Sequence, residues 1–182
     1  MQYRLVRSNR RTMAIEIRNG EVIVRTPWRT TQREIDGMLQ EKRAWIETHL
    51  QKSMERKKAA AKIQPLTSDE LKELGQNAVE YLPGRVRHYA ALLGVQPRKI
   101  TVRNQRTRWG SCSSGGNLNF NCLLMLTPPE VIDSVVVHEL CHLIEMNHSE
   151  RFYRKVYSVY PEYDRWHQWL KEHQTELMAR LG

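Results

Sequence analysis

The stretch SVVVHELCHLIEMNHSERF, residues 134–152, constrains the fold of this chain more than any other feature. It holds three histidines within eleven residues, and the first two follow the pattern H-E-x-x-H. Residues four apart lie on one face of a helix, so His138 and His142 share a face if the segment is helical. In a continuous helix, His148 would point about 240° away from His142. The segment therefore predicts a helix under the first two histidines and a turn before the third.

This arrangement predicts a metal site. Two imidazoles one helical turn apart can bind the same Zn²⁺ at about 2.0–2.1 Å, and a catalytic zinc usually has three protein ligands. His148 is the expected third ligand, because Asn147 tolerates the backbone conformation that ends a helix and Ser149 can cap the next one. Glu145 is the rival third ligand, because it lies seven residues after His138 on the same face.

Glu139 is the candidate general base. It lies about 100° around the helix from His138, which places it beside the metal position and outside the set of ligands. A carboxylate there can take a proton from a water molecule that zinc has made more acidic. An oxyanion would need a further electrophile, and the segment after His148 offers three candidates, Tyr153, Tyr157 and Tyr160.

The N-terminal part of the chain has the alternation of strands. The runs YRLVRS, TMAIEIRNG and EVIVRTP alternate apolar and polar residues, and Asn19-Gly20 predicts a tight hairpin turn between the last two. Apolar residues at helical spacing then predict a helix from Thr31 to about Lys62, and Pro65 ends the charged stretch that follows. We therefore expect a first module over residues 1–66, a basic β-hairpin with a helix.

A second block begins at Thr67, which fits a capping box with Glu70. Helical spacing continues to Gly94, the expected C-terminal cap, and Pro83-Gly84 is expected to kink or interrupt this helix. Two strands are then predicted, over residues 99–104 and 117–126, with an antiparallel pairing between them.

Two more helices complete the predicted fold. The one that carries the histidines is expected to begin at Thr127-Pro128-Pro129-Glu130, with Thr127 as its cap, and to run to Met146. The last helix is predicted over residues 163–181 from its regularly spaced tryptophans and leucines. The predicted fold class is α+β, with a second domain over residues 67–182.

The charge of the chain is unevenly distributed. The net charge is +9, yet residues 127–182 carry 6 Lys and Arg against 9 Asp and Glu. The basic surplus over residues 1–126 would suit nucleic acid or another acidic partner, although no nucleic-acid motif accompanies it. Three cysteines without a C-x-x-C pair, and a start without an apolar signal stretch, predict a cytoplasmic protein with free thiols. No apolar run is long enough for a membrane span, so no membrane contact is expected.

Four motifs in order resemble the YgjP-like zinc metallopeptidase domain family, which is related to the SprT and WLM minimal metallopeptidases. They are RWGSCSS (108–114), NLNFN (117–121), HELCH (138–142) and NHSERF (147–152). The N-terminal stretch RSNRRTMAIEIRNGEVIVRTP also resembles this family, so the likeness covers nearly the whole chain. The resemblance implies Zn²⁺ bound by three histidines and a catalytic base, which would be His138, His142, His148 and Glu139.

The resemblance further implies a minimal zincin-type domain that hydrolyses peptide bonds, with a small antiparallel sheet beside an active-site helix. In peptidases of this design an extended strand binds the substrate as an added β-strand. Asn117, Asn119 and Asn121 alternate along the candidate strand and are the expected substrate-binding residues.

Two other functions are compatible with the sequence. One is a nucleic-acid-associated protease, since the SprT and WLM groups include such enzymes and residues 1–126 are basic. The other is a non-catalytic module that keeps zinc and binds DNA or protein. A structural zinc site normally has four protein ligands, and only three good candidates are present.

Overall fold

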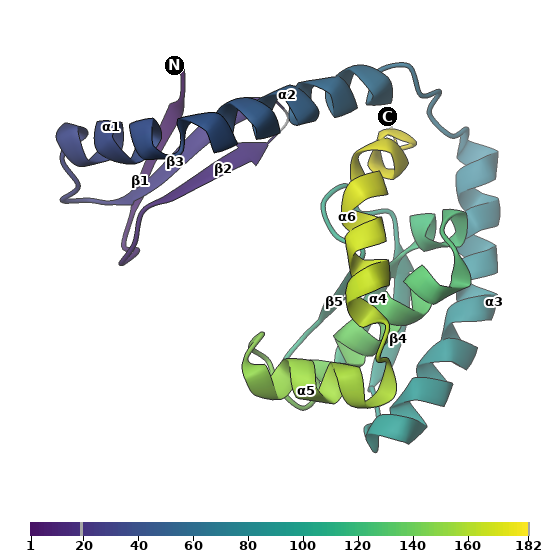
Figure 1. Cartoon of the computed structure of the whole chain (residues 1–182). Helices are drawn as coiled ribbons and strands as arrows, with labels where there is room; N and C mark the ends of the chain where they lie inside the picture. The colour runs from purple at the N-terminus through teal and green to yellow at the C-terminus, as the bar shows by residue number, and fades with distance from the viewer. Residues whose placement is uncertain (19, 182) are drawn as a thin grey trace. The chain divides into compact units, whose positions relative to one another are not determined.

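The computed structural model describes residues 1–18 and 20–181, and the chain divides into two compact units, Met1–Ile63 and Gln64–Gly182. Each unit has its own cluster of buried apolar side chains. The described residues form six α-helices and two three-stranded sheets, whose arrangement within each unit can be followed in Figure 1. The predicted α+β fold class is confirmed. No helix in the described part of the chain combines the length and the apolar character that a membrane crossing needs.

Three strands form a sheet in the first unit, in the order β1-β3-β2, with bounds β1 Arg4–Ser8, β2 Ala14–Arg18 and β3 Glu21–Pro27. β2 and β3 pair antiparallel, with Arg18 opposite Glu21, so the predicted hairpin is present. Asn19 of the predicted turn lies outside the described residues. Gly20 has a φ of 80°, a conformation that glycine adopts without strain. β1 pairs with β3 in parallel.

The helical region after this sheet is divided in two, α1 (Gln32–Glu41) and α2 (Arg43–Ala60). The single helix expected here is interrupted at Lys42, whose φ and ψ of −95° and 10° leave the helical region. Both helices run along the sheet (Figure 1). The fully buried members of the core they share with it are Val22, Val24, Ile35 and Ile46.

The second unit begins with α3 (Ser68–Leu93), whose two ends match the sequence signals. Thr67 and Glu70 form the predicted capping box, and Gly94 ends the helix with a φ of 68°. Pro83 lies inside α3, which runs through it without a break, so an interruption is wrong, whereas the alternative of a kink stays a prediction. Leu82 and Val86 on either side of it are buried in the core, and their packing holds the helix together across the missing N–H.

The second sheet has the order β4-β6-β5, with bounds β4 Lys99–Arg103, β5 Gly110–Cys112 and β6 Asn117–Asn121. β5 and β6 are antiparallel, whereas β4 and β6 are parallel and not antiparallel as the sequence suggested. The reason is that the chain crosses back as β5 before it turns into β6. β6 is therefore the central strand, with a neighbour along each edge.

The strand predicted to reach residue 126 ends at Asn121. Its side chain accepts a hydrogen bond from the backbone N–H of Leu123 and starts a 3-10 helix, Cys122–Leu126. A polar side chain that bonds its own neighbouring backbone competes with continuation of the strand. Cys122, Leu123 and Leu124 are buried, so this short helix contributes to the core.

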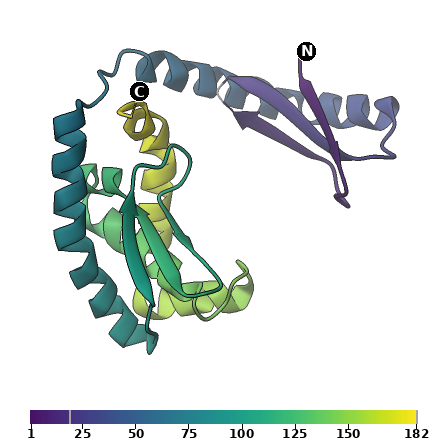
Figure 2. The same cartoon turned by 180° about the vertical axis from the view of Figure 1, so that it is seen from behind.

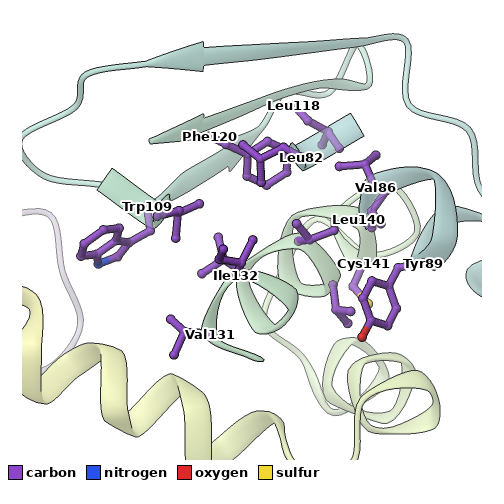
Figure 3. Packing of buried hydrophobic residues seen from close by; sticks show 14 of the residues in the cluster. Leu82, Val86, Tyr89, Trp109, Leu118, Phe120, Val131, Ile132, Leu140 and Cys141 are labelled. Atoms are coloured by element: carbon purple, nitrogen blue, oxygen red, sulfur yellow. The ribbon is translucent and has the colours of Figure 1, made fainter. Parts of the chain in front are cut away.

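Three helices complete the second unit, α4 (Pro129–Cys141), α5 (Glu150–Val159) and α6 (Tyr163–Ala179). Thr127 does not cap α4 as expected, because its hydroxyl donates to the carbonyl of Leu124. α4 is the central helix, and every residue from Val131 to Val137 is buried. Figure 2 shows the sheet on one side of α4 and α6. Figure 3 shows Leu118 and Phe120 of β6 directed toward α4, where Leu140 lies.

A partly buried ion pair fixes α4 to α3. Two nitrogens of the Arg85 guanidinium, Nε and Nη2, donate to the Asp133 carboxylate at 2.7 Å each, and the Tyr89 hydroxyl donates to it at 3.1 Å. Replacing Arg85 with alanine is expected to lower the free energy of unfolding by about 2–3 kcal/mol, because the Asp133 charge would stay buried without its partner. Urea denaturation measures this effect. The exposed pair of Lys72 and Asp69 is the control, and Lys72→Ala should leave stability unchanged.

Candidate metal centre

Three histidine side chains converge on one point. Nε2 of His138 lies 3.2 Å from Nε2 of His142 and 3.0 Å from Nε2 of His148. The ligand atoms of all three lie within 4.8 Å of one another. Nitrogens bound at about 2.1 Å to one tetrahedral ion lie about 3.4 Å apart, so the observed spacing fits a shared metal ion.

The end of α4 determines how the third histidine reaches this point. α4 ends at Cys141, and His142 is its C-terminal cap, so the helix is shorter than the predicted one that ran to Met146. The backbone N–H groups of Leu143 and Ile144 bond to carbonyls three residues back. Such bonds tighten the last turn of a helix. The chain then changes direction, which allows the side chain of His148 to reach those of His138 and His142.

The start of α5 holds His148 in place. The Ser149 hydroxyl accepts from the backbone N–H of Phe152, which is the cap predicted from the sequence. The fully buried ring of Phe152 lies 4.6–5.0 Å, centroid to centroid, from all three imidazoles. One apolar ring therefore packs against every histidine of the cluster and limits the orientations they can adopt.

Hydrogen bonds at Nδ1 leave the converging Nε2 atoms free. Nδ1 of His142 lies 3.2 Å from the carbonyl of Glu145, and a carbonyl only accepts, so the neutral ring carries its proton on Nδ1. Nδ1 of His138 lies 2.8 Å from the Tyr163 hydroxyl, which lies 3.2 Å from Nδ1 of His167. When this hydroxyl donates its one proton to His167, it accepts the Nδ1 proton of His138. Both rings then present an unprotonated Nε2, which is the form that binds metals.

Burial keeps the central histidine neutral. Burial, as the largest cause, and the neighbouring imidazoles of His142, His148 and His167 together lower the pKa of His138 to about 3. The pKa of His142 is also lowered, mainly by burial. Neutral imidazole is the metal-binding form, so both rings can bind a cation at neutral pH without first losing a proton.

The side chain of Glu145 does not lie where a metal ligand would have to lie. Its carboxylate is not among the donor atoms that converge in the described part of the chain. It contributes its backbone carbonyl to His142 instead. The geometry therefore favours His148 over Glu145 as the third nitrogen or oxygen donor.

Glu139 lies beside the histidines, on the side of α4 that faces β5. The residue is 6% exposed, and burial raises the pKa of its carboxyl to about 7 against the opposing effect of the positive charge of Arg108. A Cβ added to Gly110 would lie only 2.6 Å from Cγ of Glu139. Only glycine lets the β5 backbone lie this close, and the contact confines the carboxyl group between α4 and the edge of the sheet.

The three asparagines of β6 are placed differently from one another. Asn121 is fully buried, and its amide donates to the backbone carbonyls of Gln105 and Arg108. The hydrogen bonds of its amide are used within the fold, so the geometry does not favour Asn121 as a substrate-binding residue. Asn119 donates to the Ser111 hydroxyl of β5 at 3.2 Å, and Asn117 is half-buried.

The three tyrosines predicted as candidates to stabilise an oxyanion differ in their hydrogen bonds and in their distance from the histidines. The Tyr160 hydroxyl donates to the carbonyl of Glu130, and the Tyr157 hydroxyl donates to the Asp164 carboxylate. Tyr153 is the candidate nearest the metal centre, with its ring 6.4 Å from that of His148, centroid to centroid. Tyr163 was not among the sequence candidates, although it touches His138 directly. Its position 25 residues after His138 carries no local signal.

Comparison with known proteins adds a family match. The family described as YgjP-like, metallopeptidase domain, matches residues 11–78 and 68–173. The crystal structure of the metallopeptidase zymogen of Pyrococcus abyssi abylysin is similar to this chain, with 22% sequence identity and a TM-score of 0.46. That similarity covers 50% of this chain and 94% of that one. Among curated proteins, none matches the chain.

Proposed function

The chain belongs to the YgjP-like family of metallopeptidase domains, and we propose that it cleaves peptide bonds with a zinc ion held by His138, His142 and His148. The observation that carries this proposal is the convergence of three Nε2 atoms beside a buried glutamate. Three imidazoles suit zinc, and a site with three protein ligands leaves a position for water and substrate. When bound, zinc supplies a Lewis acid that polarises the scissile carbonyl and lowers the pKa of water toward about 7.

Glu139 is the proposed base. A carboxylate oxygen of Glu139 takes a proton from the attacking water, and the same group then delivers the proton to the leaving amine nitrogen. The pKa of about 7 that burial gives this carboxyl supports both steps, because such a group accepts and releases a proton near neutral pH. The contact with Gly110 supports the role further, since it limits the movement of the carboxylate between the two steps.

The proposed substrate site is the free edge of β5. β6 has a strand on both sides, so a peptide cannot add to it, whereas β5 pairs only with β6 among the described strands. A peptide added along Gly110–Cys112 would lie next to Glu139 and would be recognised mainly through its backbone. Asn119 would then act by holding Ser111 on β5, and Tyr153 is the proposed electrophile for the oxyanion.

Tyr163 is proposed to orient His138. Replacing Tyr163 with phenylalanine keeps the ring in the core and removes the hydroxyl that lies 2.8 Å from Nδ1 of His138. Zinc affinity is expected to fall about 10-fold, because groups that bond the far nitrogen of a histidine ligand typically contribute at least that much. Competition with a chromophoric chelator measures it. Tyr157→Phe, which loses a hydroxyl bonded to Asp164, is the matched control and should keep full affinity.

Metal analysis tests the whole proposal. Protein purified without added metal is expected to contain about one zinc per chain. Cleavage of an unfolded protein substrate such as casein should stop when phenanthroline removes the metal, and it should return when zinc is added back. Cleavage that continues in metal-free protein would contradict the proposal. Zinc without any cleavage would favour the alternative of a non-catalytic binding module.

The three cysteines of the chain are unpaired. Free thiols support the proposal that the protein works in a reducing compartment, the cytoplasm.

A further inference from the structure

Two loops of the first unit place unpaired arginines around an exposed tryptophan. Arg10 and Arg11 lie on the loop between β1 and β2, and Trp28 and Arg29 lie on the loop between β3 and α1. We refer to these four residues as the arginine–tryptophan surface. Trp28 is 62% exposed, the highest value among the exposed large apolar side chains of the described chain.

Hydrogen bonds join the two loops. The Trp28 indole N–H donates to the side-chain oxygen of Asn9 at 3.0 Å. The Arg7 guanidinium donates to the carbonyls of Trp28 and Thr30, at 2.8 Å each. The indole is therefore held by its polar edge and by its backbone, while the ring itself stays exposed to solvent. An ordered aromatic ring of this kind loses little conformational entropy when another ring stacks on it.

The two loops around Trp28 carry positive charge, and the nearest carboxylate in the sequence, Glu34, accepts hydrogen bonds from Thr31. Residues 7–13 and 25–33 contain six arginines and no aspartate or glutamate. Arg7 bonds to backbone carbonyls and Arg25 forms an ion pair with Glu16. Arg10, Arg11 and Arg29 have no carboxylate partner among the described residues, so their charges are available to an anion.

We propose that the arginine–tryptophan surface binds single-stranded nucleic acid, with a base stacked on Trp28 and backbone phosphates bound by Arg10, Arg11 and Arg29. Base stacking on an exposed aromatic side chain, combined with cations that follow the phosphate backbone, is the usual basis of sequence-independent single-strand binding. Guanidinium groups suit this role because they bind phosphate oxygens through two parallel hydrogen bonds. The proposal does not rest on the metal centre, which lies in the other unit.

The surroundings of Trp28 distinguish this partner from a lipid surface. Insertion into a membrane needs apolar area around the aromatic ring. Pro27 is the one apolar residue directly beside Trp28, and the nearby loop residues Asn9, Arg29 and Thr30 are polar or charged. Stacking needs only the face of one ring, which Trp28 offers.

Fluorescence anisotropy with labelled oligonucleotides tests the proposal on the full chain. The probes are oligothymidylate and oligouridylate of about 15 nucleotides, which separate DNA from RNA. Trp28→Ala is expected to weaken binding about 10-fold, whereas Trp28→Phe, which keeps a ring for stacking, should weaken it less than about 3-fold. Trp45→Ala removes another exposed tryptophan of the same unit, 43% exposed, and should have no effect.

The salt dependence provides a second measurement. Each phosphate contact contributes about 0.7 to the slope of log affinity against log salt for a single strand. The double variant Arg11→Ala/Arg29→Ala should therefore reduce that slope by about 1.4. Lys57→Ala/Lys58→Ala removes the same charge from an exposed end of α2 and should leave the slope unchanged.

Three results would overturn the proposal. One is the absence of binding to both oligonucleotides at low salt. Another is an equal loss of affinity in the two double variants, which would mean that only net charge matters. The third is Trp28-dependent binding to phosphatidylserine vesicles without binding to the oligonucleotides, which would assign the surface to membranes.

Discussion

Replacing Glu139 with glutamine is expected to lower kcat/KM for peptide cleavage by about 10³-fold while the protein keeps its zinc. Glutamine has the shape of glutamate, so it fits the narrow space beside Gly110 and leaves the histidines undisturbed. It cannot accept the proton of the attacking water. The loss should therefore appear in catalysis and not in metal content, and a peptidase assay together with metal analysis on the same preparation separates the two.

A second glutamate serves as the control. Glu145→Gln makes the same chemical change at a residue that contributes only its backbone carbonyl to the centre, so activity is expected to stay within about 3-fold of the unchanged protein. Unchanged cleavage by Glu139→Gln would show that another group acts as base. Loss of zinc from that variant would instead show that Glu139 binds the metal.

Replacing His148 with alanine is expected to lower zinc affinity by about 10³-fold. The free energy of zinc binding by protein sites is about 10–16 kcal/mol, and loss of one ligand of three removes about 4 kcal/mol, which corresponds to that factor. The fold should be kept, because His148 is exposed and lies before the Ser149 cap of α5. Titration against a chromophoric chelator measures the affinity, and circular dichroism checks the helices.

Glu145→Ala is the matched variant for this measurement. It removes the rival carboxylate and leaves the backbone carbonyl that bonds His142, so zinc affinity should change by less than about 3-fold. The opposite pattern, with affinity kept in His148→Ala and lost in Glu145→Ala, would make Glu145 the third ligand. Such a result would also require the turn after α4 to rearrange when metal binds.

Local chemistry made the ends of several elements predictable. Thr67 with Glu70, Gly94 and Ser149 each act within four residues of the element they begin or end, and all three are found as expected. Capping depends on hydrogen bonds between near neighbours, so the sequence is sufficient to identify it. The hairpin of β2 and β3 was predictable for the same reason.

Where the structure differs from the elements predicted from the sequence, contacts between distant residues overrode the local signals. Pro83 predicted a kink or an interruption, yet α3 continues through it because Leu82 and Val86 pack into the core. The run 117–126 predicted one strand, yet the buried Asn121 turns the chain into a 3-10 helix. The parallel pairing of β4 with β6 depends on where β5 inserts, and no local signal specifies that insertion.

In the metal centre, too, some features follow from the local sequence and others from tertiary contacts. The spacing of His138 and His142 places them on one helical face, because helix geometry alone determines which residues share a face. The proton position of His138 and the confinement of Glu139 depend on Tyr163 and Gly110, which come from other elements. Side chains far apart in sequence meet only when the core packs, so the sequence identified the chemical groups and the tertiary structure decided how they are oriented.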